Sequence, residues 1–156
     1  MGTDNTTLAR RYMTEVWGKG NLAAIDELVD KDVVVSDTMG TDLRGIEKVK
    51  QMVDMMKTTF SDNTFTIEEI IVAGDRVVIR HTWQGVHRGD FFGIPGTGRT
   101  VKNPGIDVLR IANGKVVEDI GYMDSYAMFQ QLGALPDRDK LVQPRPAAEA
   151  QPTRQP

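Results

Sequence analysis

The chain has 156 residues, no cysteine and a formal net charge of −3 at pH 7. This length suits one domain with a single core. The charge argues against nucleic acid or an anionic membrane as the main partner, and the lack of cysteine leaves no disulfide or thiolate metal site. No apolar run approaches the roughly 18 residues of a membrane span, and no signal-peptide pattern opens the chain. We therefore expect a cytoplasmic protein.

Three helices are predicted in the first sixty residues. In residues 8–17 apolar side chains recur every four positions, and Gly18-Lys19-Gly20 ends this helix. Asn21 is expected to cap a second helix, whose apolar residues are Ile25, Leu28 and Val29. A third helix follows Gly45, with apolar residues at steps of three and four up to Phe60. Its methionines are Met52, Met55 and Met56. They could line a pliable pocket, but we favour core filling.

After Phe60 the apolar period changes to two, which is typical of strands. Residues 64–73 and 77–87 are predicted strands joined by a hairpin turn, followed by strands at about 99–111 and at 116–123. Asp124 is then expected to cap a short helix. Helices followed by consecutive hairpins predict an α+β fold, with the three helices packed on one face of a curled antiparallel sheet. The helices and the concave face of this sheet would then enclose a pocket.

The composition changes at Pro136. The segment from there to Pro156 is rich in Pro, Ala and Gln. Such a segment cannot bury enough apolar area to offset the entropy lost on ordering. Residues 1–135 are therefore expected to form one domain, and residues 136–156 a flexible tail.

Asp37 and Asp107 each lie in an otherwise apolar, strand-like run, at residues 33–37 and 105–109. A buried carboxylate is costly unless it has a partner or a task. With Tyr12 from the first helix, the two acids predict a small enclosed site for proton transfer. The alternative is that both acids lie at strand edges in water.

Five segments resemble, in order, those of the SnoaL-like polyketide cyclases. They are residues 85–89 (GVHRG), 92–99 (FGIPGTGR), 105–110 (GIDVLR), 113–118 (NGKVVE) and 131–133 (QLG). The resemblance spans about residues 5–135 and implies the cone-shaped α+β fold of nuclear transport factor two, which also includes ketosteroid isomerase and limonene epoxide hydrolase. It further implies acid–base chemistry without a cofactor or metal on a small apolar molecule. The fold alone does not fix the reaction.

A local similarity to ketosteroid isomerase involves residues 11–13, 35–40 and 106–110. Carried over, it implies that Asp37 is the general base, that Tyr12 is an oxyanion-hole phenol, and that Asp107 is the protonated acid beside it. A base then removes a proton next to a carbonyl, while two neutral donors stabilise the enolate oxygen.

The chain departs from the cyclase pattern in its last strand. Many SnoaL-like cyclases have an aspartate directly after a tryptophan there, where this chain has Ile120-Gly121. The acid function is then expected at Asp107, Asp119 or His81. Alternatively, the protein binds without turnover, and Gly121 leaves room for a bulky ligand.

The residues of the last strand that face the site depend on one turn. A three-residue loop at 112–114 would set Asp107 opposite Asp119, with Gly121 and Met123 on the same face. A two-residue Asn113-Gly114 turn would instead place Ile120, Tyr122 and Asp124 there. We favour the first because it agrees with the family. The close like charges of Asp107 and Asp119 would then raise one pKa.

Further candidate ligand contacts lie on two elements. On the second long strand, His81, Trp83 and His87 share the predicted inner face, although His87 is equally suited to holding the next loop. Met56 and Phe60 are candidates from the third helix. Two histidines without metal-ligand spacing make no metal site, and the glycine-rich residues 93–98 precede no helix, which excludes a phosphate loop.

The favoured function is a cyclase or isomerase acting on a small, apolar, carbonyl-bearing substrate such as a polyketide intermediate. An epoxide hydrolase, in which an acid pair holds a water, is the alternative enzyme, and a non-catalytic ligand-binding module is the alternative outside enzymes. A homodimer or higher homo-oligomer is expected, because an open curled sheet leaves apolar residues on its outer face.

Overall fold

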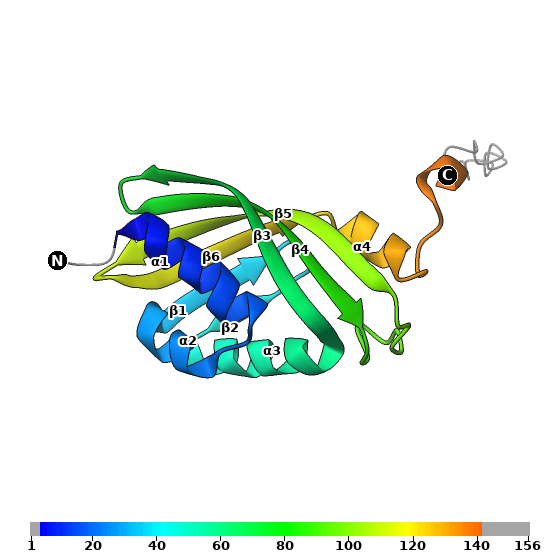
Figure 1. Cartoon of the computed structure of the whole chain (residues 1–156), viewed down its shortest axis with the longest axis horizontal. Helices are drawn as coiled ribbons and strands as arrows, with labels where there is room; N and C mark the ends of the chain where they lie inside the picture. Colours follow the sequence, from blue (N-terminus) through cyan, green and yellow to red (C-terminus); the bar gives the residue numbers. More distant parts are fainter. Residues whose placement is uncertain (1–3, 142–156) are drawn as a thin grey trace, which may run out of the picture.

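The computed structural model describes residues 4–141, in which a six-stranded sheet arches over the N-terminal helices (Figure 1). Along the chain the elements are α1 (Asn5–Arg11), the π-helix η1 (Tyr12–Gly18), α2 (Leu22–Leu28), β1 (Val29–Asp37), β2 (Asp42–Arg44), α3 (Ile46–Thr59), β3 (Phe60–Ala73), β4 (Arg76–His87), β5 (Thr100–Ala112), β6 (Lys115–Met123), α4 (Ser125–Gln131) and α5 (Arg138–Leu141). The predicted α+β class with N-terminal helices is confirmed.

The strand order is β2-β1-β6-β5-β4-β3. Strands β3 to β6 pair antiparallel, as predicted, whereas β1 runs parallel to β6. The sheet is therefore mixed and not wholly antiparallel. A short hairpin forces two strands to be antiparallel, but β1 and β6 are separated by β2, α3 and β3 to β5. The sequence therefore did not determine the direction of β1 relative to β6. The three-residue strand β2 at the edge was not predicted.

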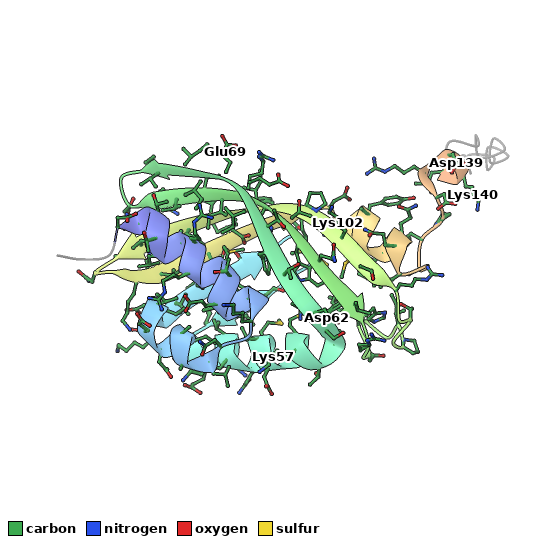
Figure 2. The ribbon with its side chains drawn as sticks, in the orientation of Figure 1. Lys57, Asp62, Glu69, Lys102, Asp139 and Lys140 are labelled. Atoms are coloured by element: carbon green, nitrogen blue, oxygen red, sulfur yellow. The ribbon has the colours of Figure 1, made fainter. Side chains whose placement is uncertain are left out.

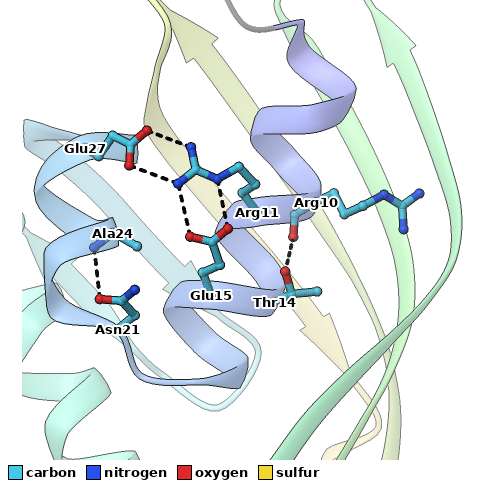
Figure 3. A network of polar contacts seen from close by, with 7 residues as sticks. All are labelled: Arg10, Arg11, Thr14, Glu15, Asn21, Ala24 and Glu27. Atoms are coloured by element: carbon cyan, nitrogen blue, oxygen red, sulfur yellow. Dashed lines mark hydrogen bonds and ion pairs between the residues drawn. The ribbon is translucent and has the colours of Figure 1, made fainter.

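The first helix changes its winding at Tyr12, where α1 continues as η1. The π-helix η1 winds more widely, with hydrogen bonds from i to i+5, and its residues Tyr12, Met13 and Val16 are all buried. Arg11 pairs with Glu15 of the same helix at 2.9 Å and with Glu27 of α2 at 2.7 Å, and the second pair links this helix to its neighbour (Figure 3).

Two predicted helices extended one residue too far. Val29 and Phe60 are the first residues of β1 and β3, not the last residues of α2 and α3. In both places the helix passes into the strand without a loop. Both side chains are buried, 1% and 0% exposed, so the apolar pattern continues across the boundary and hides it.

The buried side chains form two apolar clusters. The larger lies between the N-terminal helices and the sheet, and includes Leu8, Val16, Ile25, Val33, Val49, Val77, Ile79 and Leu109. The smaller lies toward the other end of the sheet, under α4, and consists of Phe60, Trp83, Phe91, Val101, Met128 and Leu132. Charged side chains such as Lys57, Asp62 and Glu69 lie on the outside (Figure 2).

The β5–β6 turn has two residues, Asn113 and Gly114, both with positive φ (51° and 71°), so the predicted three-residue loop is wrong. A bulge follows, because Ile111 pairs with Val116 but Arg110 pairs with Glu118. Val117 is thus the extra residue, and it exchanges the two faces of the rest of β6. Asp119, Gly121 and Met123 consequently face inward, as expected. Asp107 pairs with Gly121, not with Asp119.

The end of the described chain contains the helix α4 and the beginning of the predicted tail. Asp124 caps α4 by accepting a hydrogen bond from the backbone N of Ala127 at 2.9 Å, as predicted. The predicted tail begins at Pro136, whose carbonyl accepts a hydrogen bond from Tyr126, and residues 142–156 of it lie outside the described residues. Within residues 4–141, no helix is long and apolar enough to span a membrane.

Candidate functional site

A cavity of about 210 Å³ lies between the helices and the concave face of the sheet. Its wall is formed by side chains of η1, β1, α3, α4 and strands β3 to β6. Most of these side chains are apolar. The acidic, imidazole and amide groups among them are Asp37, Asn63, His81, Asn103, Asp107 and Asp119. A mostly apolar pocket with a few convergent polar groups is typical of a small-molecule site.

The two acids identified from the sequence lie on either side of Gly121. Gly121 pairs with Asp37 of β1 on one side and with Asp107 of β5 on the other. A Cβ atom built on Gly121 would lie 3.0 Å from Oδ1 of Asp107 and 3.6 Å from Cβ of Asp37. Adjacent strands are about 4.8 Å apart, which places the two acids on next-nearest strands roughly 10 Å apart at Cα. The glycine leaves the space between them open.

Asp107 is in contact with His81. Its Oδ2 atom lies 2.5 Å from Nε2 of the imidazole, and the two side chains are only 15% and 8% exposed. Gly105 makes this contact possible, since a Cβ there would lie 2.9 Å from Cε1 of His81. His81 thus occupies space that a side chain at position 105 would otherwise fill.

Asp119 is hydrogen-bonded to Tyr12 on the side away from the cavity. The buried phenol donates a hydrogen bond of 2.7 Å to Oδ2 of Asp119. Oδ1 of Asp119 is buried and has no hydrogen-bond partner within residues 4–141. Asp119 lines the cavity, whereas Tyr12 is fully buried and is not part of its wall. The phenol therefore acts on the cavity only through Asp119.

Burial of these groups changes their protonation. It raises the pKa of Asp107 to about 6, and the charge of Asp37 adds to the shift. Burial, followed by the charge of Asp107, raises the pKa of Asp119 well above its usual range, although the hydrogen bond from Tyr12 opposes this. Burial also lowers the pKa of His81. These shifts favour the protonated form of Asp119 and the neutral form of the His81 imidazole.

Asp37 is placed differently. Its Oδ1 atom accepts hydrogen bonds from the backbone N of Met39 at 2.8 Å and of Thr41 at 3.0 Å. These bonds close the turn after β1 and orient the carboxyl group. Asp37 is half-buried and lines the cavity. Its Oδ2 atom makes no hydrogen bond within the described chain, which leaves it available to a ligand.

The other predicted ligand contacts separate into two groups. Trp83, Met56 and Met123 line the cavity. Phe60 and His87 are not part of its wall. Phe60 instead packs edge-on against Trp83, with ring centroids 4.9 Å apart. His87 accepts a hydrogen bond from the backbone N of Thr97 at 3.3 Å, so it holds the loop after β4, which was one of the two roles expected for it.

Methionines form a large part of the cavity wall, and sequence reasoning missed three of them, Met13, Met39 and Met128. All seven that the structure describes line the cavity: Met13, Met39, Met52, Met55, Met56, Met123 and Met128. Met52, Met55 and Met56 of α3 thus line the pocket, which was the less favoured of the two roles considered for them, and Met56 also packs against the smaller apolar cluster. Unbranched thioether side chains suit a wall that adapts to its contents. Asn63 and Asn103 were also missed.

Comparison with known proteins places the chain in a family. The family model for the SnoaL-like polyketide cyclase matches residues 7–132. The chain belongs to this family. Aklanonic acid methyl ester cyclase DnrD of Streptomyces peucetius is 28% identical over 127 residues, which cover 79% of this chain and 87% of DnrD.

Two solved structures show the same fold. A protein from Jannaschia sp. CCS1, assigned to the SnoaL-like polyketide cyclases, has a TM-score of 0.78 and 25% identity, covering 86% of this chain and 95% of its own. A protein of Catenulispora acidiphila with a ketosteroid isomerase-like fold has a TM-score of 0.71 and 19% identity, covering 82% and 93%. The second likeness concerns the fold alone.

The raised pKa of Asp107 predicts a pH-dependent stability. An unfolded aspartate has a pKa of about 3.9, so between about pH 4 and pH 6 the folded protein retains a proton that the unfolded chain releases. The free energy of unfolding therefore falls as the pH rises through this window, by up to about 3 kcal/mol, and the loss persists at pH 7. Asp107→Asn removes this loss and can still donate to His81. We expect it to be neutral or stabilising at pH 7 in thermal and urea unfolding.

Asp107→Ala is the matched control, because it leaves a void and removes the partner of His81. We expect it to be less stable than Asp107→Asn at every pH. A strong destabilisation by Asp107→Asn at pH 7 would show instead that Asp107 is an ionised structural acid.

Proposed function

We propose that the protein is a cofactor-free acid–base enzyme acting on a small, apolar, carbonyl-bearing substrate, most simply a polyketide cyclase that closes a ring by an intramolecular aldol-type reaction. One observation carries this proposal: Asp37 and Asp107 face the same open space above Gly121, in a cavity that is otherwise mostly apolar. Membership of the cyclase family supports it.

In the proposed reaction Asp37 is the general base. Its free Oδ2 atom takes a proton from the carbon next to the substrate carbonyl, and the electron pair moves onto the carbonyl oxygen. The resulting enolate carbon then attacks a second carbonyl of the same molecule, which forms the ring bond and restores the first carbonyl. The new alkoxide takes the proton that Asp37 removed. In a ketosteroid isomerase-like reaction Asp37 would instead return its proton to another carbon. General base catalysis contributes roughly 10²–10⁴-fold.

Asp119, and Asp107 in its protonated form, are the proposed donors to the developing oxyanion. Asp107, with a pKa of about 6, takes this role mainly below that pH. Donors that are already oriented in a low-dielectric site stabilise such charge strongly. Asp107 and Asp119 both line the cavity and both have raised pKa values because of burial. Tyr12, expected from the sequence to be a direct donor, is bonded to Asp119. We assign it the positioning of that acid.

An epoxide hydrolase remains the second enzyme candidate. It requires one acid to protonate the epoxide oxygen and another to activate a water, and the open space between Asp107 and Asp37 has room for such an arrangement. Opening of an epoxide in ¹⁸O-labelled water, with the label appearing in a diol, would favour this reaction over enolisation. A protein that binds apolar ketones and promotes neither reaction would be a binding module.

Asp37→Asn tests the base directly. The amide oxygen can still accept both backbone hydrogen bonds, so the fold is retained while the basicity is lost. We expect α-proton exchange of an apolar aryl ketone in D₂O, followed by NMR, to slow by roughly a hundredfold or more. The exposed Asp42→Asn on β2 is the control and should exchange at the wild-type rate. Full activity of Asp37→Asn would remove Asp37 from the mechanism.

We also propose that the protein forms a homodimer through the outer face of the sheet. Ile106 and Tyr122 are paired neighbours there, 39% and 54% exposed, and Ile71 of β3 is 52% exposed. An apolar face of this kind is usually covered, and a symmetric dimer is the commonest way to do so.

Light scattering at micromolar concentration should therefore give the mass of a dimer. Tyr122→Asp is expected to shift it toward the monomer, whereas Lys48→Glu on α3, away from the sheet face, should not. A strictly monomeric wild-type protein would refute the proposal.

A further inference from the structure

Asn103 is a buried amide without a partner on the wall of the cavity. It is 4% exposed and lies on the inner face of β5, four residues before Asp107. Its Oδ1 atom is buried and has no hydrogen-bond partner within residues 4–141. Native proteins rarely leave a buried acceptor unpaired, since the group has lost water without gaining a bond. The partner is therefore expected among the contents of the cavity.

The polar groups near Asn103 are already bonded to one another. Asn103 is opposite Trp83 in the β4–β5 ladder. The indole of Trp83 donates to Oδ1 of Asn63 at 3.1 Å, and Asn63 in turn donates to the carbonyl of Phe60 at 2.7 Å. Two further buried polar atoms, Nε2 of His87 and Oγ of Ser125, also have no hydrogen-bond partner within residues 4–141, but neither residue lines the cavity. Asn103 is thus the amide on the wall whose oxygen is left for a ligand.

Asn103 and the acids mark two ends of the cavity. A strand rises about 3.3 Å per residue, so Asn103 lies roughly 13 Å from Asp107 along β5. The side chains that line the space around them are largely methionine and aromatic. A ligand that satisfies both ends has a carbonyl at one end, an apolar body, and a hydrogen-bond donor at the other end.

We infer that Asn103 is a ligand-anchoring residue, whose Oδ1 atom accepts a hydrogen bond from a hydroxyl group remote from the reacting carbonyl. This inference rests on the proposed function, because it takes the carbonyl to lie at Asp37 and Asp107. It narrows the substrate class to apolar ketones that carry a distal hydroxyl group. Asn103 then selects among ketones and sets their direction in the cavity, but takes no part in proton transfer.

Two ketones that differ only in the distal group test this inference. They are 2-acetylnaphthalene and 6-hydroxy-2-acetylnaphthalene, with binding measured by calorimetry. We expect the wild-type protein to bind the hydroxylated ketone roughly tenfold more tightly, as for one hydrogen bond to a buried neutral group. Asn103→Leu should bring this ratio close to one while the protein remains at least as stable, because it removes an unpaired polar group. Asn103→Ala should lose the ratio in the same way if the leucine does not fit.

Gln131→Leu is the matched control. It removes an amide outside the cavity wall whose hydrogen bonds to the backbone of Lys102 are already made within the protein, so it should lower stability and leave the binding ratio near the wild-type value. Equal binding of both ketones by the wild-type protein, or an unchanged ratio in Asn103→Leu and Asn103→Ala, would overturn the role of Asn103. The proposed function would survive that result if α-proton exchange continued. If neither ketone bound to the wild-type protein, both proposals would fail.

Discussion

Two carboxyl groups buried in one apolar space cannot both ionise, and the site is organised around this constraint. Asp107 and Asp119 are each shielded from water, and the charge of Asp107 further raises the pKa of Asp119. The protein stabilises them with one neutral partner each, His81 for Asp107 and Tyr12 for Asp119. The four side chains come from η1, β4, β5 and β6. The helices and the sheet must therefore be packed together before the acids acquire their raised pKa values.

The arrangement depends on backbone features that carry no chemistry themselves. The bulge at Val117 turns Asp119 and Gly121 toward the cavity, and Glu118 toward Arg76 on the other face. Gly105 and Gly121 have no side chain and therefore leave room. Gly105 leaves room for the imidazole of His81, and Gly121 leaves open the region between Asp37 and Asp107. The absence of a carboxylate at position 121 is thus compatible with acid–base chemistry, because two other acids border the same space.

The sequence predicted the elements well, because their apolar patterns are local. The helices and the four long strands follow from periods near 3.6 and 2, and Asp37 and Asp107 were identified because acids are unusual in apolar strand-like runs. The contacts between distant elements were less accessible. Tyr12 was assigned to the oxyanion, but its hydroxyl group bonds to Asp119, 107 residues away in the chain. The wrong turn at Asn113-Gly114 gave the correct face for β6 only because the bulge compensated for it, and no local pattern marks that bulge.

Asp107 and Asp119 keep their protons to a higher pH than an ordinary aspartate does. The chemical shifts of their carboxyl carbons report this directly. The most direct measurement is a titration of the ¹³Cγ resonances of the aspartates by NMR, assigned with Asp107→Asn and with Asp119→Asn. We expect Asp107 to titrate near pH 6 and Asp119 to titrate well above the ordinary aspartate value of about 3.9. Ionisation of both Asp107 and Asp119 below pH 5 would contradict this expectation.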